Sequence, residues 1–229
     1  MDFDNKYFLE RQKNNHLRTK MYELDYRYST KMLKRIRLKG TVTTLDVGCS
    51  DGEFSKKFLE LGPVYGIEIN QQQAQKAALN GIKLVNLHEI QSVKPDIVIL
   101  RGTLQHISSE EFHEIMAYYP ALILLLQTPN PNSFVYKLLN PFQIALLTPS
   151  AGFQGNVNLI SLRKVKYLLA NQGLRVLNIS KPYLSTPYAN PVKDLLSLFM
   201  CYFDKNRKYS GSWKGNIYRM AIVRGEGNV

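Results

Sequence analysis

Short apolar runs that alternate with amphipathic segments constrain this chain more than any other feature. The first run, residues 42–47, leads into the segment Asp46-Val47-Gly48-Cys49-Ser50-Asp51-Gly52, and a helix-forming stretch follows. A strand, a glycine-containing turn and a helix in this order form the unit from which doubly wound α/β domains are built. The sequence therefore predicts a Rossmann-like α/β fold.

Six further runs complete the predicted sheet. They are mostly apolar and rich in β-branched residues, as expected of strands covered by helices on both faces. We predict strands at residues 42–47, 64–69, 82–87, 96–100, 121–126, 174–180 and 216–223, and helices at 52–61, 71–79, 108–117 and 161–172. The pattern predicts a mostly parallel, doubly wound sheet of seven strands.

The remaining segments differ in composition from this core. Residues 1–39 are polar, basic and rich in tyrosine, with apolar side chains at helical spacing, and they predict an N-terminal helical cap. Residues 40–229 predict the α/β domain, with insertions near residues 128–158 and 181–214 that lack a regular period. These insertions and the cap are the expected determinants of substrate choice.

The net charge of +12 favours an anionic partner, whether nucleic acid, a phospholipid surface or a phosphate-bearing substrate.

No run approaches the roughly 18 apolar residues that a membrane-spanning helix needs, and the first residues lack the apolar stretch of a signal peptide. Two cysteines are too few for a disulfide framework. We expect a cytoplasmic protein without a membrane span. Its charge is compatible with weak association with an anionic surface, and the sequence does not indicate the oligomeric state.

The glycine turn and a second acidic residue predict a nucleoside ligand. Glu68 ends the second predicted strand, 20 positions after Gly48, which is about the offset at which a carboxylate accepts from ribose hydroxyls. The turn holds two glycines, Gly48 and Gly52, instead of the three that cradle a pyrophosphate, and Asp46 and Asp51 flank them. Two carboxylates repel a pyrophosphate but suit an ammonium and a sulfonium. The sequence therefore favours S-adenosylmethionine over NAD.

Four segments in order resemble the motifs of class I S-adenosylmethionine-dependent methyltransferases, and the resemblance covers roughly residues 40–180. Residues 46–52 are similar to motif I and Glu68 to the acidic end of motif II. Residues 95–107 and 126–130 resemble motif IV and the Thr-Pro-Asn segment of the ubiquinone-biosynthesis and type 23 subgroup, with Gln105 in place of its usual glutamate.

The resemblance implies cofactor contacts at the ends of four strands. The implied residues are Asp46, Gly48, Cys49, Ser50, Asp51, Gly52, Glu68, Ile69, Leu87, His88, Arg101 and Gly102. The turn would line the methionine end of the cofactor, Glu68 and Ile69 would hold its ribose and adenine, and Leu87 and His88 would flank the adenine. Arg101, beside the transferred methyl, would contact the methionine carboxylate or a substrate anion.

His106 is the candidate general base for an acceptor hydroxyl, and packing against the following helix is the alternative role. The histidines form no spaced set with carboxylates, so we expect no metal. Residues 181–191 look similar to segments in methyltransferases of bacterial surface-polysaccharide pathways, which implies a small-molecule acceptor, a hydroxyl of a sugar or of a glycan or lipid precursor. An RNA methyltransferase, favoured by the net charge, and a catalytically silent partner protein of the same fold are the alternatives.

Overall fold

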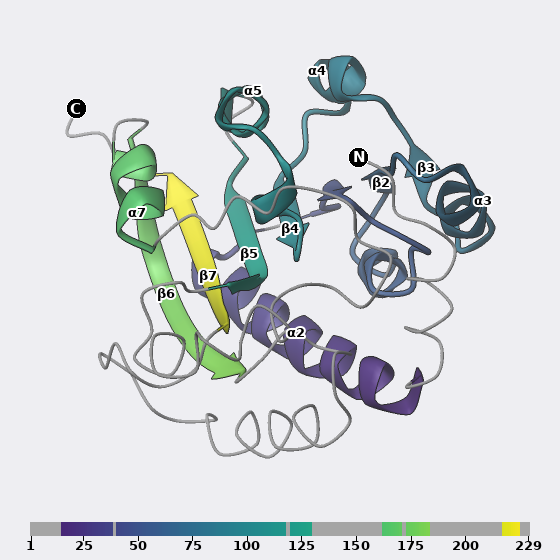
Figure 1. The fold of residues 1–229 in the computed structure, drawn as a ribbon, viewed down its shortest axis with the longest axis horizontal. Coiled ribbons are helices and arrows are strands. Elements are labelled where there is room, and N and C mark those ends of the chain that lie inside the picture. Colours follow the sequence, from purple (N-terminus) through teal and green to yellow (C-terminus); the bar gives the residue numbers. More distant parts are fainter. Residues whose placement is uncertain are drawn as a thin grey trace, which may run out of the picture.

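A computed structural model describes residues 15–38, 40–117, 120–129, 162–170, 173–183 and 217–224. Helices and strands alternate along these residues, as the sequence predicts (Figure 1). The elements are α2 (Asn15–Ile36), β1 (Thr44–Val47), η1 (Ser55–Phe58), β2 (Val64–Ile67), α3 (Gln71–Leu79), β3 (Lys83–Leu84), η2 (Leu87–Glu89), α4 (Ile90–Val93), β4 (Ile97–Arg101), η3 (Leu104–His106), α5 (Ser109–Ala117), β5 (Leu122–Pro129), α7 (Leu162–Ala170), β6 (Leu174–Tyr183) and β7 (Ile217–Arg224), where η denotes a 3-10 helix.

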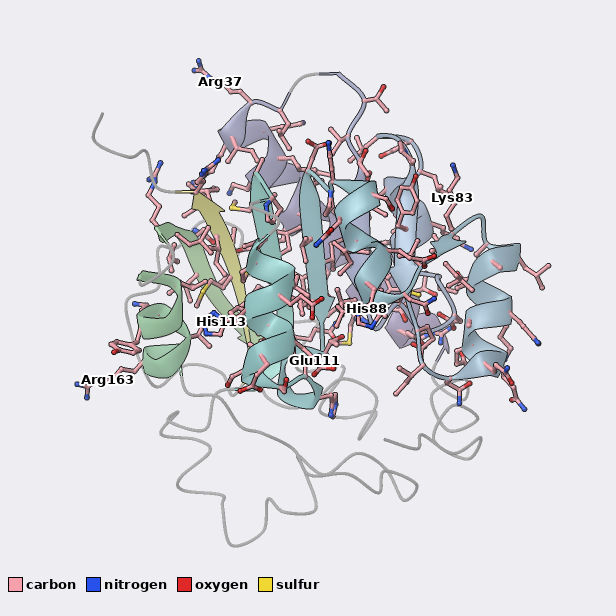
Figure 2. All side chains as sticks on the ribbon, turned by 90° about the horizontal axis from the view of Figure 1, so that it is seen from above. Arg37, Lys83, His88, Glu111, His113 and Arg163 are labelled. Carbon is pink, nitrogen blue, oxygen red and sulfur yellow. The ribbon has the colours of Figure 1, made fainter. Side chains whose placement is uncertain are left out.

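The strands form one sheet in the order β3-β2-β1-β4-β5-β7-β6. All neighbouring pairs from β3 to β5 are parallel, while β7 runs antiparallel to both β5 and β6. The carboxyl ends of β1, β2 and β4 therefore meet at one edge of the sheet. In Figure 2, Lys83 of the outer strand β3 lies toward the right, and Arg163 of the helix α7 lies toward the left.

Helices cover both faces of the sheet, because alternate residues of the central strands point to opposite sides. Ile97 and Ile99 of β4 pack with α2, η1 and α3, whereas Val98 and Leu100 pack with α4, α5 and α7. Figure 2 shows α5 in front of the strands and the purple α2 behind them. The helix α2 thus supplies core residues for one face of the sheet.

All seven predicted strands are present, and the predicted mostly parallel doubly wound fold is confirmed. The helix predicted over residues 52–61 is wrong, because only the 3-10 turn η1 forms there. Phe54 and Phe58 are buried with Tyr22 and Tyr26 of α2, and these aromatic contacts override the local helical preference. Most of the two predicted insertions lies outside the described residues, and the boundary after residue 39 stays a prediction.

In the part of the chain that the structure describes, every helix is too short or too polar to span a bilayer.

Candidate functional site

The carboxyl ends of β1, β2 and β4 bring most of the predicted site residues to one edge. Val47 of β1 is paired with Ile67 on one side and with Leu100 on the other. The residues that follow, Gly48, Glu68 and Arg101, therefore lie side by side. This edge is where open α/β sheets bind their ligands.

The turn after β1 requires glycine at its first position. Gly48 has a φ of +76°, and a Cβ there would lie 2.6 Å from Oγ1 of Thr103. Its N–H donates to the carbonyl of Ile67 over 2.8 Å, so the turn is tied to β2 as well as packed against the segment after β4. Gly52 closes the turn with a φ of +74°. The two glycines of the predicted motif thus allow the turn because they adopt positive φ angles that other residues rarely adopt.

Glu68 is held by the backbone on both sides of its carboxylate. The N–H of Ser50 donates to Oε2 over 2.8 Å, and the N–H of Asn70 donates to Oε1 over 2.8 Å. Each carboxylate oxygen can accept a second hydrogen bond. The neighbouring Ile69 is 65% exposed, which is unusual for a large apolar side chain. The end of β2 therefore presents a fixed carboxylate beside an apolar side chain.

Asp46 is buried at the end of β1 and carries an unused acceptor. Ser55 donates a hydrogen bond to its Oδ2, while Oδ1 has no hydrogen-bond partner among the described residues. Burial raises the pKa of Asp46 to about 6, although the Ser55 hydrogen bond and the positive charge of Arg101 act in the opposite direction. A buried carboxylate oxygen without a partner is costly unless a ligand uses it.

Cys49 packs inside the turn. A Cβ on Gly66 of β2 would lie 2.6 Å from the Cys49 sulfur, so the glycine makes room for the thiol. Burial raises the pKa of the Cys49 thiol well above its ordinary value, and nearby Asp46 and Glu68 raise it further. A thiol in this environment stays protonated and acts as a packing residue.

Two acidic residues near this edge are paired with arginines of other elements. Asp51, in the turn, accepts a hydrogen bond from Arg18 of α2 over 2.9 Å, in a largely buried ion pair. Arg101, the last residue of β4, donates from Nε to Asp25 of α2 over 3.1 Å. Both pairs join α2 to the edge of the sheet.

The other predicted residues lie around this edge. Gly102 has a φ of +65°, and a Cβ there would meet nothing within 4 Å among the described residues. His106, in η3, is half-buried, and burial lowers its pKa to about 4. Leu87 packs against the core and His88 is exposed, and within the described segments no hydrogen bond links either to the β1 turn. No group of three metal-binding side chains is present in the described part of the chain.

The contribution of α2 to this edge was not predicted from the sequence. Arg18 and Asp25 reach the edge from that helix, and Gln127 of β5 and Arg219 of β7 join Asp25 there. One signal was present in the sequence, because Asp25 lies among apolar side chains at helical spacing, with Met21 four residues before it. Its partners could not be identified from sequence spacing.

No known family model and no curated protein matches this sequence. Solved structures do match. A methyltransferase of Clostridium acetobutylicum that depends on S-adenosylmethionine aligns with a TM-score of 0.57 and 10% identity, over 89% of this chain and 92% of that chain. The plantazolicin methyltransferase BpumL, in complex with SAH, aligns with a TM-score of 0.56 and 13% identity, over 96% and 90%.

A third structure, a possible histamine N-methyltransferase of Thermotoga maritima, aligns with a TM-score of 0.54 and 12% identity, over 94% of this chain and 97% of that chain. At such identities the likeness concerns the fold. This chain therefore has the fold of the S-adenosylmethionine-dependent methyltransferases.

Proposed function

We propose that the chain is an S-adenosylmethionine-dependent methyltransferase that binds its cofactor at the carboxyl edge of β1, β2 and β4. The observation that carries the proposal is the buried Oδ1 of Asp46, which has no hydrogen-bond partner among the described residues. It lies in a cluster of carboxylates with Glu68 and Asp51, whose negative charges also raise the pKa of Cys49. Such a cluster fits a cationic ligand and disfavours a pyrophosphate.

The remaining residues of the edge fit the parts of this cofactor. Glu68, whose carboxylate is held in place by the N–H groups of Ser50 and Asn70, would accept from the two ribose hydroxyls. Ile69 would pack against the adenine, and Leu87 and His88 would flank it. The turn from Gly48 to Gly52 would contact the methionine end.

When bound, the cofactor supplies a methyl group activated by a sulfonium, so the protein needs chiefly to orient the acceptor and exclude water. His106 follows β4 and is neutral at physiological pH, because burial lowers its pKa to about 4. It would hydrogen-bond an acceptor hydroxyl and take its proton as the methyl is transferred. Arg101 would orient an anionic group of the cofactor or of the acceptor.

We further propose a small-molecule acceptor, a hydroxyl of a sugar or of a glycan or lipid precursor. The resemblance of residues 181–191 to methyltransferases of surface-polysaccharide pathways supports this choice, and so does the resemblance to the ubiquinone-biosynthesis and type 23 subgroup. The net charge of +12 suits a nucleotide- or lipid-linked sugar, whose phosphates are anionic.

The exposed face of α2 favours RNA as the second candidate acceptor. Arg27, Lys31, Lys34 and Arg35 are exposed on this helix, and no acidic residue lies between Arg27 and Arg37. Phosphate contacts by such residues give an affinity that falls steeply with salt. A salt-independent interaction with RNA, or none, would remove this candidate.

A methyl-transfer screen with labelled cofactor tests the acceptor class directly. Nucleotide sugars, isoprenoid quinol precursors and RNA are offered separately to the full chain. We expect label to enter a nucleotide or lipid-linked sugar. Label in RNA alone would establish the second candidate, and tight cofactor binding without transfer to any acceptor would favour the catalytically silent partner protein.

A further inference from the structure

Asp25 of α2 is a fully buried carboxylate that contacts side chains from β4, β5 and β7. It is 0% exposed, and it accepts from Nε of Arg101 over 3.1 Å and from Nε2 of Gln127 over 2.6 Å. Nη1 of Arg219 lies 3.6 Å from its other oxygen. A buried carboxylate is stable only when its charge is offset in this way. One residue of the N-terminal helix therefore organises the ends of β4 and β5 and the start of β7.

The same contacts fix the position of the Arg101 guanidinium. Its central carbon lies 4.2 Å from the centre of the Tyr22 ring and 5.2 Å from that of Phe54, and the side chain is only 7% exposed. The ion pair and the Tyr22 ring hold the cation against α2, and the Phe54 ring, just before η1, contacts it as well. Its positive charge nevertheless reaches Asp46, where it partly opposes the rise in pKa that burial causes.

A fixed cation at this edge opposes the positive charge of a sulfonium. If S-adenosylmethionine binds beside Asp46, as proposed above, its sulfonium and Arg101 are like charges in a site of low effective dielectric. The negative charge of Asp25, which also faces Arg219, offsets part of this positive charge at the sulfonium. The demethylated product, S-adenosylhomocysteine, carries a neutral thioether, so the charge of Asp25 has little effect on its binding.

We propose that Asp25 is a positioning residue of the cofactor site, which acts through Arg101 to favour the methylated, cationic cofactor over its neutral product. This role rests on the proposed cofactor. By holding Arg101 against α2 and balancing its charge, Asp25 limits the repulsion between Arg101 and the sulfonium. The N-terminal helix thereby takes part in discriminating substrate from product.

Calorimetric titration of both ligands into single and double variants tests this role. Asp25→Asn removes the charge and keeps an acceptor, and we expect it to weaken S-adenosylmethionine relative to S-adenosylhomocysteine by about tenfold. Arg101→Gln leaves Asp25 beside Arg219 and Gln127, and we expect it to shift the preference in the opposite direction. In the double variant the two shifts should cancel.

Glu23→Gln is the matched control, because Glu23 lies on the same helix but is 38% exposed and paired with Lys20. It should leave the preference unchanged. A merely structural Asp25 would weaken both ligands equally in Asp25→Asn, and that result would overturn the proposed role. If Asp25→Asn does not fold, an unchanged preference in Arg101→Gln overturns it equally well. A wild-type chain that binds neither ligand would overturn the cofactor assignment itself.

Discussion

The backbone N–H of Ser50 donates a 2.8 Å hydrogen bond to Oε2 of Glu68, which ties the turn after β1 to the end of β2. Ser50 adopts a positive φ of 54°, which is uncommon outside glycine, and this conformation accompanies the bond. The Asn70 N–H holds the other oxygen of the same carboxylate. The conformation of the turn thus depends on a side chain whose two oxygens each accept a hydrogen bond from a backbone N–H.

Replacing Glu68 with glutamine should therefore affect cofactor binding strongly. A glutamine amide offers one acceptor and one donor, so one of the two N–H groups would face another donor. We expect S-adenosylhomocysteine to bind at least about tenfold more weakly, a loss of about 1.4 kcal/mol. Isothermal titration calorimetry measures it. Glu110→Gln, an exposed change on α5, is the control, and equal affinities in both variants would contradict the role of Glu68.

Asp46 should give the folded protein a characteristic dependence on pH. Its pKa is about 6 when folded and near the ordinary 3.8 when unfolded, so the folded state alone binds this proton between those values. Its contribution to stability is fully present below the unfolded pKa and is lost as pH rises through about 6. The advantage of Asp46→Asn over the wild type should therefore grow by roughly 2 to 3 kcal/mol between pH 4 and 7. Urea unfolding at several pH values measures this difference, and a constant difference would contradict the buried charge.

His106 should act without titrating near neutrality. Because burial lowers its pKa to about 4, the imidazole is already neutral above roughly pH 5. We expect His106→Ala to reduce kcat by about 100-fold or more. In the wild type, the pH profile of kcat/KM should show no ionisation of His106 between about pH 5.5 and 8. Unchanged turnover in His106→Ala would leave His106 with its packing role.

Gly48 and Gly40 form a matched pair for testing the turn. Both have a positive φ, but a Cβ on Gly48 would lie 2.6 Å from Thr103 Oγ1, whereas on Gly40 it would meet nothing within 4 Å. Alanine at Gly40 should cost about 1 kcal/mol of unfolding free energy, and alanine at Gly48 about 1 to 3 kcal/mol more. Chemical denaturation measures both variants. Thr103→Ala in the Gly48→Ala background should recover part of the loss, and equal costs at the two glycines would contradict the close packing.

The sequence allowed the sheet to be predicted because its strands are buried on both faces and read as continuous apolar runs, such as residues 121–126. Because Asp46 and Glu68 lie at the carboxyl ends of two neighbouring parallel strands, their position at one edge of the sheet could also be predicted. The ion pairs of α2 could not be predicted, because Arg18 and Asp51 are 33 positions apart and Asp25 and Arg101 are 76 apart. Such pairings depend on where a helix crosses the sheet, which local periodicity does not specify.

The short η1 shows the same limit on a local scale. Ser55 turns inward to donate to the buried Asp46, and Phe58 packs its ring edge-on against Tyr26 of α2. These tertiary contacts replace the regular helix that the composition of residues 52–61 favours. Prediction failed at the segment whose conformation supports the candidate site.

Calorimetric titration of the wild-type chain with S-adenosylmethionine tests the central claim most directly. We expect one cofactor molecule per chain with micromolar affinity, and weaker binding below about pH 6, where Asp46 becomes protonated and can no longer offset a positive ligand. NAD in the same experiment should not bind. No heat of binding at millimolar S-adenosylmethionine, or preferential binding of NAD, would contradict the account.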